Sequence, residues 1–344
     1  MQLEHWIEAL EQHTPACLEA KFEIVTPMFI GDGDQRARSI RSASVKGALR
    51  FWWRALNWGR CLSQAQGDTT RALNQLHQEE ARLFGAAVST QAENPGGQGL
   101  FTLKVSQPET LKVINDWPKD GNAACGFIGF GLWKTNKTSQ REALAEGTRF
   151  LVSCQLKAQI SAEQTRQLTD ALAVFGLLGS LGSRARRGFG SLAIKELNGE
   201  SYAFKSQAEY IQALQKHLQA VERPAANVAF TSPITAWSEA SSVHFYAKKN
   251  NPRLALAQLS EIYKEARTGL NRQQKSRMGL PLADFDTQSR RTSPFIMHIH
   301  PLGTDYFALM SFLPAAFHPN YPLSQTEAEQ PLHRLKQAAQ EKWL

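Results

Sequence analysis

The alternation of apolar and polar residues predicts several strands. From Leu18 to Ile30, apolar residues alternate with polar ones, which is typical of a strand with one buried face. Thr26-Pro27 interrupts this alternation, so we expect a bend or a sheet edge there. Further strands are predicted at 100–105, 148–160 and 189–194.

Helical periodicity appears between these strands. A helix capped by Ser42 or Ser44 is predicted to run to about Trp58. Its apolar stripe consists of Val45, Leu49, Trp52 and Leu56. A second amphipathic helix is predicted over 163–176, and Glu79–Gly85 reads as a helix end closed by glycine. The order of strand, helix, two strands, helix and strand is the βαββαβ plan of ferredoxin-like, RRM-type domains.

A second unit is predicted from near Asn227, after a polar helical stretch over 200–226. It contains strand-like runs, one central helix and a C-terminal helix, which are predicted at 243–246, 295–300, 306–313, 254–267 and 332–344. The chain has 344 residues, of which 42% are hydrophobic, and this is enough to fill two cores. We therefore expect an α+β protein of two domains.

Basic residues are concentrated in one stretch of the chain. The formal net charge is +8 and the pI about 9.3. Between Gln35 and Arg60 there are seven basic residues and no acidic one. A solvated surface usually mixes its signs, so this stretch indicates a surface that faces phosphate. The seven are Arg36, Arg38, Arg41, Lys46, Arg50, Arg54 and Arg60.

Several function classes are disfavoured by composition. The chain has no run of 18 apolar residues and a mean hydropathy of −0.37, so no membrane span is expected. The N-terminus lacks the basic-then-apolar pattern of a signal peptide, which predicts a cytoplasmic protein. No Cys-x-x-Cys pair occurs among the four cysteines, which we interpret as core residues rather than zinc ligands.

The predicted basic helix carries Lys46, Arg50 and Arg54 at intervals of four residues, away from its apolar stripe. Phosphate contacts from such a face would be independent of sequence and sensitive to salt. One of Trp52 and Trp53 must point away from the stripe, and Trp53 is a candidate to stack on a base or a partner. The alternative is a solvated helix face with core aromatics.

A glycine-rich basic loop, Gly179–Ser191, follows the second helix. Glycine allows the backbone to approach phosphate, and arginine supplies a planar, charged donor fork. The alternative is a tight turn with solvated arginines. The loop lacks the Gly-Lys-Ser/Thr ending of a Walker loop, so ATP binding is disfavoured and no cofactor is expected. Its candidate RNA-binding residues are Gly182, Arg184, Arg186, Arg187 and Gly188.

These segments together resemble a known family. Thr26–Gly31, Ile40–Ser42 and Ser44–Arg54, the last with the sequence KGALRFWWR, closely resemble the RAMP superfamily of CRISPR-associated proteins. Within it they are similar to the subunit-one family of type III-B Cmr effector complexes. Gly182–Ser191 resembles the glycine-rich loop of the family, and Phe84-Gly85 its LFG segment. Weaker matches follow at Tyr263–Arg267, Gly279–Pro281 and Ser293-Pro294.

The resemblance implies two ferredoxin-like, βαββαβ RAMP domains in tandem, which we divide as 1–200 and 201–344. It implies a non-catalytic RNA-binding subunit of a crRNA-guided complex in antiviral defence. Such a subunit caps the backbone near the 3′ region of the guide and contacts target RNA. The implied partners are crRNA, single-stranded target RNA and the other Cmr subunits. Slicing in the family is assigned to a different RAMP subunit.

An enzymatic alternative rests on two loop carboxylates and on histidines. Asp32 and Asp34 follow the first predicted strand, and family slicers place a catalytic aspartate in a comparable loop, where a carboxylate holds a divalent ion. The competing interpretation is a turn that favours Asp and Gly. His5 and His13 suggest a metal-independent processing ribonuclease, although those enzymes carry their glycine-rich loop near the C-terminus.

Three further alternatives remain open. His298 and His300 would lie on one face of a strand as a metal pair, but no third ligand is evident. The basic run over 264–277 is either a second RNA surface or a solvated helix end. The chain could also be a purely structural subunit that contacts only neighbouring proteins.

Overall fold

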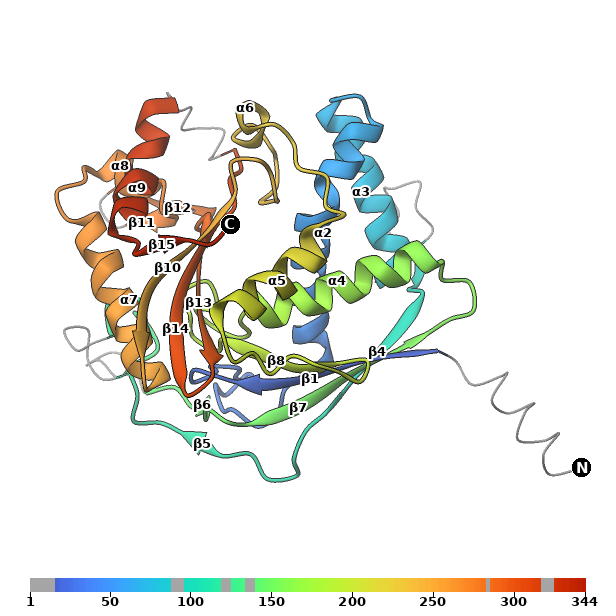
Figure 1. Cartoon of the computed structure of the whole chain (residues 1–344), viewed down its shortest axis with the longest axis horizontal. Helices are drawn as coiled ribbons and strands as arrows, with labels where there is room; N and C mark the ends of the chain where they lie inside the picture. The colour runs from blue at the N-terminus through green and yellow to red at the C-terminus, as the bar shows by residue number, and fades with distance from the viewer. Residues whose placement is uncertain (1–15, 88–95, 119–124, 134–139, 283–284, 317–324) are drawn as a thin grey trace, which may run out of the picture.

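Two main antiparallel sheets, three two-stranded sheets and the surrounding helices make up the described part of the molecule (Figure 1). The computed structural model describes residues 16–87, 96–118, 125–133, 140–282, 285–316 and 325–344. Among these residues, no helix has the length and apolar character that a membrane span requires.

The first sheet has the strand order β4-β7-β1-β8-β9, with β1 in the centre and antiparallel to both neighbours. Helices α2 and α4 contact each other, and both belong to this unit. Apart from an additional helix directly after the first and several short strands, the element order is the predicted strand, helix, two strands, helix and strand. The bounds are β1 (Cys17–Ile24), α2 (Ser42–Gln64), α3 (Thr69–Phe84), β4 (Phe101–Ser106), β7 (Arg149–Leu156), α4 (Ala162–Leu178), β8 (Leu192–Leu197) and β9 (Glu200–Ser201).

Strand β1 confirms the predicted alternation but is shorter than expected. Leu18, Ala20, Phe22 and Ile24 are buried, and the intervening residues are exposed or half-buried. The strand ends at Ile24, just before Thr26-Pro27, where a bend or a sheet edge was predicted. There the Thr26 hydroxyl donates a hydrogen bond of 2.6 Å to the Gly188 carbonyl, which joins the chain to the glycine-rich loop.

Helix α2 is longer than predicted and begins differently. Its N-cap residue is Arg41, and no side chain caps the helix, so the prediction of a Ser42 or Ser44 cap was wrong. The helix continues past Trp58 to Gln64 because α3 packs along it and buries a second face. Gly85 closes α3 with a φ of +82°, a left-handed conformation that confirms the predicted glycine end.

The second sheet has the order β13-β14-β10-β15, so its strands follow the same second-third-first-fourth arrangement as β4-β7-β1-β8. Helix α7 contacts β10, β13 and β14. The predicted helix over 332–344 ends early, because Glu341 and Lys342 pair with β10 as β15. The bounds are β10 (Ser242–Lys249), α7 (Pro252–Arg267), β13 (Phe295–Leu302), β14 (Asp305–Phe312), α9 (Gln325–Ala338) and β15 (Glu341–Lys342).

Residues after position 200 contact both units. Strand β9 pairs with β8, and Tyr210 on α5 donates a hydrogen bond of 2.6 Å to the Leu177 carbonyl of α4. The Tyr210 ring also lies 4.6 Å from the ring of His300 on β13. The remaining elements are β2 (Gly85–Ala86), β3 (Gly97–Gln98), β5 (Val113–Ile114), β6 (Ala143–Leu144), α5 (Gln207–Leu218), α6 (Ala226–Ala229), α8 (Arg272–Ser276), β11 (Leu280–Leu282) and β12 (Asp286–Arg291).

Candidate nucleic-acid interface

The glycine-rich loop lies where the two units meet. It leads from α4 to β8, and the Ser183 amide donates a hydrogen bond of 2.8 Å to the Phe29 carbonyl beyond β1. On its other side, Arg187 forms a parallel bridge with Met297 of β13, whose amide donates to the Arg186 carbonyl at 3.1 Å. The loop is therefore held by both sheets.

Two predicted glycines serve this close contact between chain segments. Gly182 has a φ of +98°, and a Cβ atom there would lie 2.7 Å from the Phe29 carbonyl oxygen. Gly188 has a φ of +78°, and a Cβ atom there would lie 2.7 Å from Cδ1 of Leu256 on α7. Larger residues would be strained at both positions. The close approach that these glycines permit is thus to the protein itself.

Arg186 and Arg187 reach across to the second unit. The Arg186 guanidinium donates to the Ser293 carbonyl at 2.6 Å and lies 4.6 Å from the centre of the Phe51 ring on α2. Arg187 donates to the Met278 carbonyl at 3.1 Å, and its guanidinium lies 4.4 Å from the Tyr263 ring. Both arginines therefore tie the two units together.

Arg184 is the exposed member of the loop. Its Nε and Nη2 atoms both donate to the Phe130 carbonyl, at 3.0 and 2.6 Å. Burial lowers the pKa of Arg184, and the nearby charges of Arg187 and Arg141 lower it further. The pKa of Arg186 falls to about 10, mainly through burial and then through Arg291 and Arg187.

We call Arg141, Arg184, Arg186, Arg187 and Arg291 the arginine cluster. In the described part of the chain, no carboxylate forms an ion pair with any of them. Among the described residues, none is a hydrogen-bond partner of the buried atoms Nε of Arg141 and Nη1 of Arg187. Crowded cations without a counter-charge form a site that favours an anion. Sequence reasoning missed Arg141 and Arg291, since only the fold brings them to the loop.

The loop before α2 carries Arg36, Arg38 and Arg41. Arg38 forms ion pairs with Asp32 at 2.7 Å and Asp34 at 3.7 Å, whereas Arg36 is exposed. Arg41 donates to the Gly31 carbonyl at 3.0 Å and is exposed. Because Gly31 follows closely on Phe29, which holds Ser183, this loop and the glycine-rich loop are neighbours.

The carboxylate of Asp32 organises a turn. It accepts hydrogen bonds from the amides of Asp34 and Arg36 at 3.0 and 3.1 Å, besides its ion pair with Arg38. The Arg36 amide and the Arg38 charge hold its pKa below the ordinary value. This geometry is that of a backbone turn, the competing interpretation of the Asp-Gly sequence.

The basic helix differs from its prediction, which assumed that no acidic partner was near. Glu80 on α3 is buried and pairs with Arg54 at 2.7 Å and with Arg50 at 3.7 Å. Arg50 also donates to the Gly85 carbonyl. Lys46 lies 5.5 Å from the Phe101 ring, and burial together with Arg50 lowers its pKa. Of the three basic residues, Arg50 and Arg54 therefore hold α3 against α2.

The candidate stacking residue Trp53 was wrongly predicted. Its side chain is only 1% exposed and packs edge-to-face on Phe84, with ring centroids 6.0 Å apart. Trp52 is buried as well. Both tryptophans are covered because α3 packs on one face of α2 and α4 on another. A base cannot reach either ring.

The family follows from a comparison of the sequence with family models. The model of the RAMP superfamily matches residues 21–193, which is half of the chain and includes both basic segments. The chain belongs to the RAMP superfamily. This finding confirms the resemblance read from the sequence.

Among curated relatives, this RAMP protein is 26% identical to the Cmr subunit Cmr1-1 of Pyrococcus furiosus, over 81% of this chain and 82% of that protein. It is 28% identical to Cmr1-2 of the same organism, over 51% of this chain and 93% of that protein. Its fold resembles the apo crystal structure of Pyrococcus furiosus Cmr1, with a TM-score of 0.61 and 22% identity, over 95% of this chain and 98% of that chain. A chain of the type III-B Cmr-beta complex bound to cognate target RNA has a TM-score of 0.56, 12% identity and coverage of 93% and 100%.

The candidate histidines can be located in part among the described residues of this RAMP protein. There, no group of three His, Cys, Asp or Glu side chains is placed to hold an ion. His298 and His300 are buried, with Nε2 of the first 3.1 Å from Nδ1 of the second. The candidates His5 and His13 lie outside the described residues.

The buried histidine pair predicts a loss of stability in acid. Burial lowers the pKa of His298 to about 3 and that of His300 well below its usual value. The unfolded chain therefore takes up protons below about pH 6.5 that the folded chain excludes. We expect each histidine to cost up to about 1.4 kcal/mol of unfolding free energy per pH unit below that point, and to cost nothing above it.

Urea unfolding at pH 7.0 and 5.5 measures this slope. The His300→Phe variant should lose less stability between the two pH values than the wild type, whatever its stability at pH 7. His77→Gln, at an exposed position of α3, is the matched control and should keep the wild-type slope. An unchanged slope in His300→Phe would contradict the prediction.

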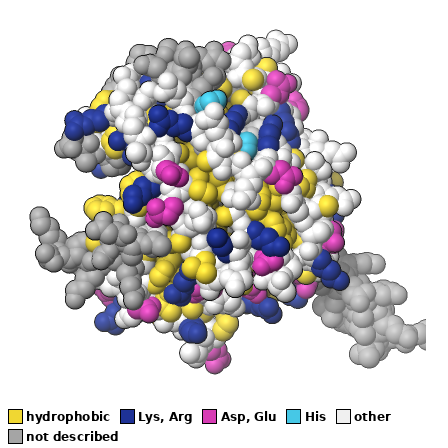
Figure 2. Space-filling model, turned by 60° about the vertical axis from the view of Figure 1, so that its left-hand side comes forward, with side chains coloured by type: hydrophobic (Ala, Val, Ile, Leu, Met, Phe, Trp, Pro, Cys, Tyr) yellow, Lys and Arg dark blue, Asp and Glu magenta, His cyan; other side chains and the backbone are white. Residues whose placement is uncertain are grey.

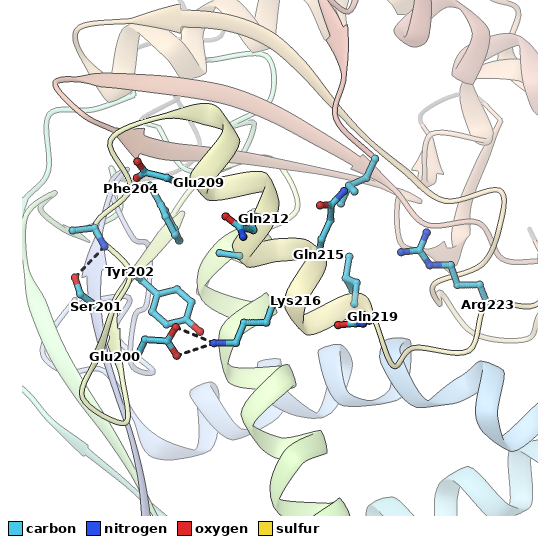
Figure 3. A pocket seen from close by; sticks show the side chains of 14 residues that line it. Glu200, Ser201, Tyr202, Phe204, Glu209, Gln212, Gln215, Lys216, Gln219 and Arg223 are labelled. Atoms are coloured by element: carbon cyan, nitrogen blue, oxygen red, sulfur yellow. Dashed lines mark hydrogen bonds and ion pairs between the residues drawn. The ribbon is translucent and has the colours of Figure 1, made fainter.

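A pocket of about 920 Å³ lies along α5 and β9 (Figure 3). Lys216 and Glu200 form an ion pair at its wall, 2.9 Å long. The Tyr202 hydroxyl, in the same wall, is 2.7 Å from Nε2 of His217, whose Nδ1 lies 2.9 Å from Asp170. Burial raises the pKa of Tyr202, which makes it a poor nucleophile. We interpret this chain of hydrogen bonds as structural, because it links the residue after β9 to α5 and α4.

Charges are mixed on the face drawn in Figure 2. Basic and acidic side chains lie interspersed around a central hydrophobic area. A net charge of +8 therefore does not produce one broad basic patch on this face. The unbalanced charge is local, as in the arginine cluster.

Proposed function

We propose that this RAMP protein is a non-catalytic, RNA-binding subunit of a crRNA-guided type III-B CRISPR effector complex. The identity to Cmr1-1 over four fifths of both chains supports this assignment. The fold shared with Cmr1, and with a chain of a Cmr-beta complex that holds target RNA, is consistent with it. Its partners would be crRNA, single-stranded target RNA and other Cmr subunits.

The arginine cluster carries the proposal. Its guanidinium groups crowd together, two of their buried nitrogens have no partner, and in the described structure no carboxylate balances them. RNA phosphates at the exposed face of the cluster, where Arg184 lies, would supply the missing negative charge. Contacts of this kind ignore base sequence, which suits a protein that must accept guides of any sequence.

The two sheets support a tandem arrangement of RAMP domains. Each has the strand order of a ferredoxin-like fold, and the arginine cluster lies at their junction. We infer that RNA crosses this junction in single-stranded form. In the assembled complex the subunit would cap the backbone near the 3′ region of the guide.

The contacts that the candidate carboxylates make are consistent with a non-catalytic role. Asp32 is committed to two backbone amides and to Arg38, and Asp34 lies near the same arginine. A metal-dependent nuclease needs carboxylates that are free to hold an ion. We therefore expect bound RNA to remain intact with and without magnesium.

Binding of the purified chain to RNA across a salt series tests the function. We expect single-stranded RNA to bind more tightly than double-stranded RNA, with an affinity that falls steeply between about 50 and 200 mM salt. Gel analysis of the same samples, with magnesium or with EDTA, should show uncut RNA. Salt-independent or absent binding would contradict the RNA-binding role, and magnesium-dependent cleavage would contradict the non-catalytic one.

A further inference from the structure

The segment of residues 125–133 holds an aromatic side chain in solvent beside the arginine cluster. Phe130 is 65% exposed, far more than a core phenylalanine, although the segment itself is well anchored. Cys125, Ile128 and Leu132 are buried in the core of the second unit. A single exposed apolar side chain is common on protein surfaces, so what points to a ligand here is the position of this ring beside the arginine cluster.

The local backbone fixes which side chains point outward. The Gly129 amide donates to the Cys125 carbonyl, and the Leu132 amide donates to the Gly129 carbonyl, each at 2.9 Å. These tight turns place Ile128 and Leu132 on the buried side and leave Phe130 on the other. Gly131, with a φ of +87°, allows the chain to turn directly after the ring.

Two contacts hold Phe130 in place. Trp133 packs edge-to-face against its ring at 6.0 Å, and the Trp133 indole donates to the Gly126 carbonyl at 3.1 Å. Arg184 donates two hydrogen bonds, from Nε and Nη2, to the Phe130 carbonyl. The ring is therefore fixed to the member of the arginine cluster that is most open to solvent.

We propose that Phe130 is a stacking platform for one unpaired base of single-stranded RNA, whose phosphate is held by Arg184 and Arg141. A cation beside an exposed ring is the combination that single-stranded nucleic acid uses, because every base offers a π-face and every nucleotide a phosphate. The uncompensated positive charge favours RNA over an apolar protein partner. The inference rests on the proposed RNA-binding function and adds a base contact to it.

Phosphate contacts weaken as salt rises, whereas base stacking does not. A salt series therefore distinguishes the stacking role of Phe130 from the proposed RNA-binding function. We expect Phe130→Ala to weaken single-stranded RNA binding about tenfold at every salt concentration, with an unchanged slope of log affinity against log salt. Phe130→Trp should restore the affinity. Val228→Ala, at another exposed apolar position, is the matched control and should bind like the wild type.

A series of RNAs, each with one abasic nucleotide, tests the contact itself. In the wild type, one position in the series should reproduce the tenfold loss, and in Phe130→Ala the same position should add nothing. If Phe130→Ala binds as tightly as a wild type that shows the steep salt slope, the stacking inference is wrong and the RNA-binding function stands. If the variant keeps its RNA affinity but no longer joins the other Cmr subunits, the ring contacts protein and the inference is overturned.

Discussion

The double variant Arg41→Gln/Arg184→Gln is expected to bind single-stranded RNA about 25-fold more weakly than the wild type at 0.1 M salt. Each phosphate contact to a single strand contributes about 0.7 to the slope of log affinity against log salt, so two lost contacts remove about 1.4. The two affinities should converge near 1 M salt, because the missing term is electrostatic. Glutamine removes the charge at each position and keeps one amide donor on a shorter side chain.

Fluorescence anisotropy with a labelled RNA across the salt series measures both quantities. Arg149→Gln/Arg166→Gln is the matched control, because these exposed arginines are paired with Glu23 and with Glu163 and Asp170. It removes the same total charge, so it reports the general effect of net charge on binding. Equal losses in both double variants would show that neither Arg41 nor Arg184 holds an RNA phosphate.

Glu80→Ala is expected to lower the free energy of unfolding by about 2 to 3 kcal/mol. The Glu80 side chain is only 9% exposed and faces both Arg50 and Arg54, which are each about one third exposed. Loss of one partner from a buried ion pair costs about 3 to 5 kcal/mol, because it leaves an uncompensated charge. We expect a smaller loss of about 2 to 3 kcal/mol here, since water partly screens the two arginines.

Urea unfolding at pH 7 measures this change. Glu200→Ala is the control, because it removes an exposed pair with Lys216 and should cost less than about 1 kcal/mol. The Glu80→Ala variant also tests whether the basic face of α2 contacts RNA. If Arg50 and Arg54 contacted RNA, the loss of Glu80 would tighten RNA binding. We expect the affinity to stay unchanged.

Local sequence patterns were enough to predict the elements of the first unit. The alternation in β1, the stripe of α2 and the glycine end of α3 each depend on residues a few positions apart. Strand β15 was missed because two residues of an exposed, polar sequence become a strand only by pairing with β10.

The candidate site depended more on distant residues. The arginines of the glycine-rich loop were identified, but Arg141 lies 43 positions before Arg184 and Arg291 lies 104 positions after Arg187, and no local pattern marks them. The ion pair between Glu80 and Arg54 was missed for the same reason, because Glu80 lies on a different helix from the basic residues. Trp53 was misplaced since a second helix covers the face that the apolar stripe left open.

The seating of the glycine-rich loop also limits how the protein can be divided. Arg186 and Arg187 belong in sequence to the first unit, yet the carbonyls that accept their hydrogen bonds belong to Ser293 and Met278 in the second. A fragment that ends near residue 200 would retain these arginines and lose their acceptors. The two halves are therefore not interchangeable modules, and a chimera made by swapping the second half would inherit a loop fitted to another partner.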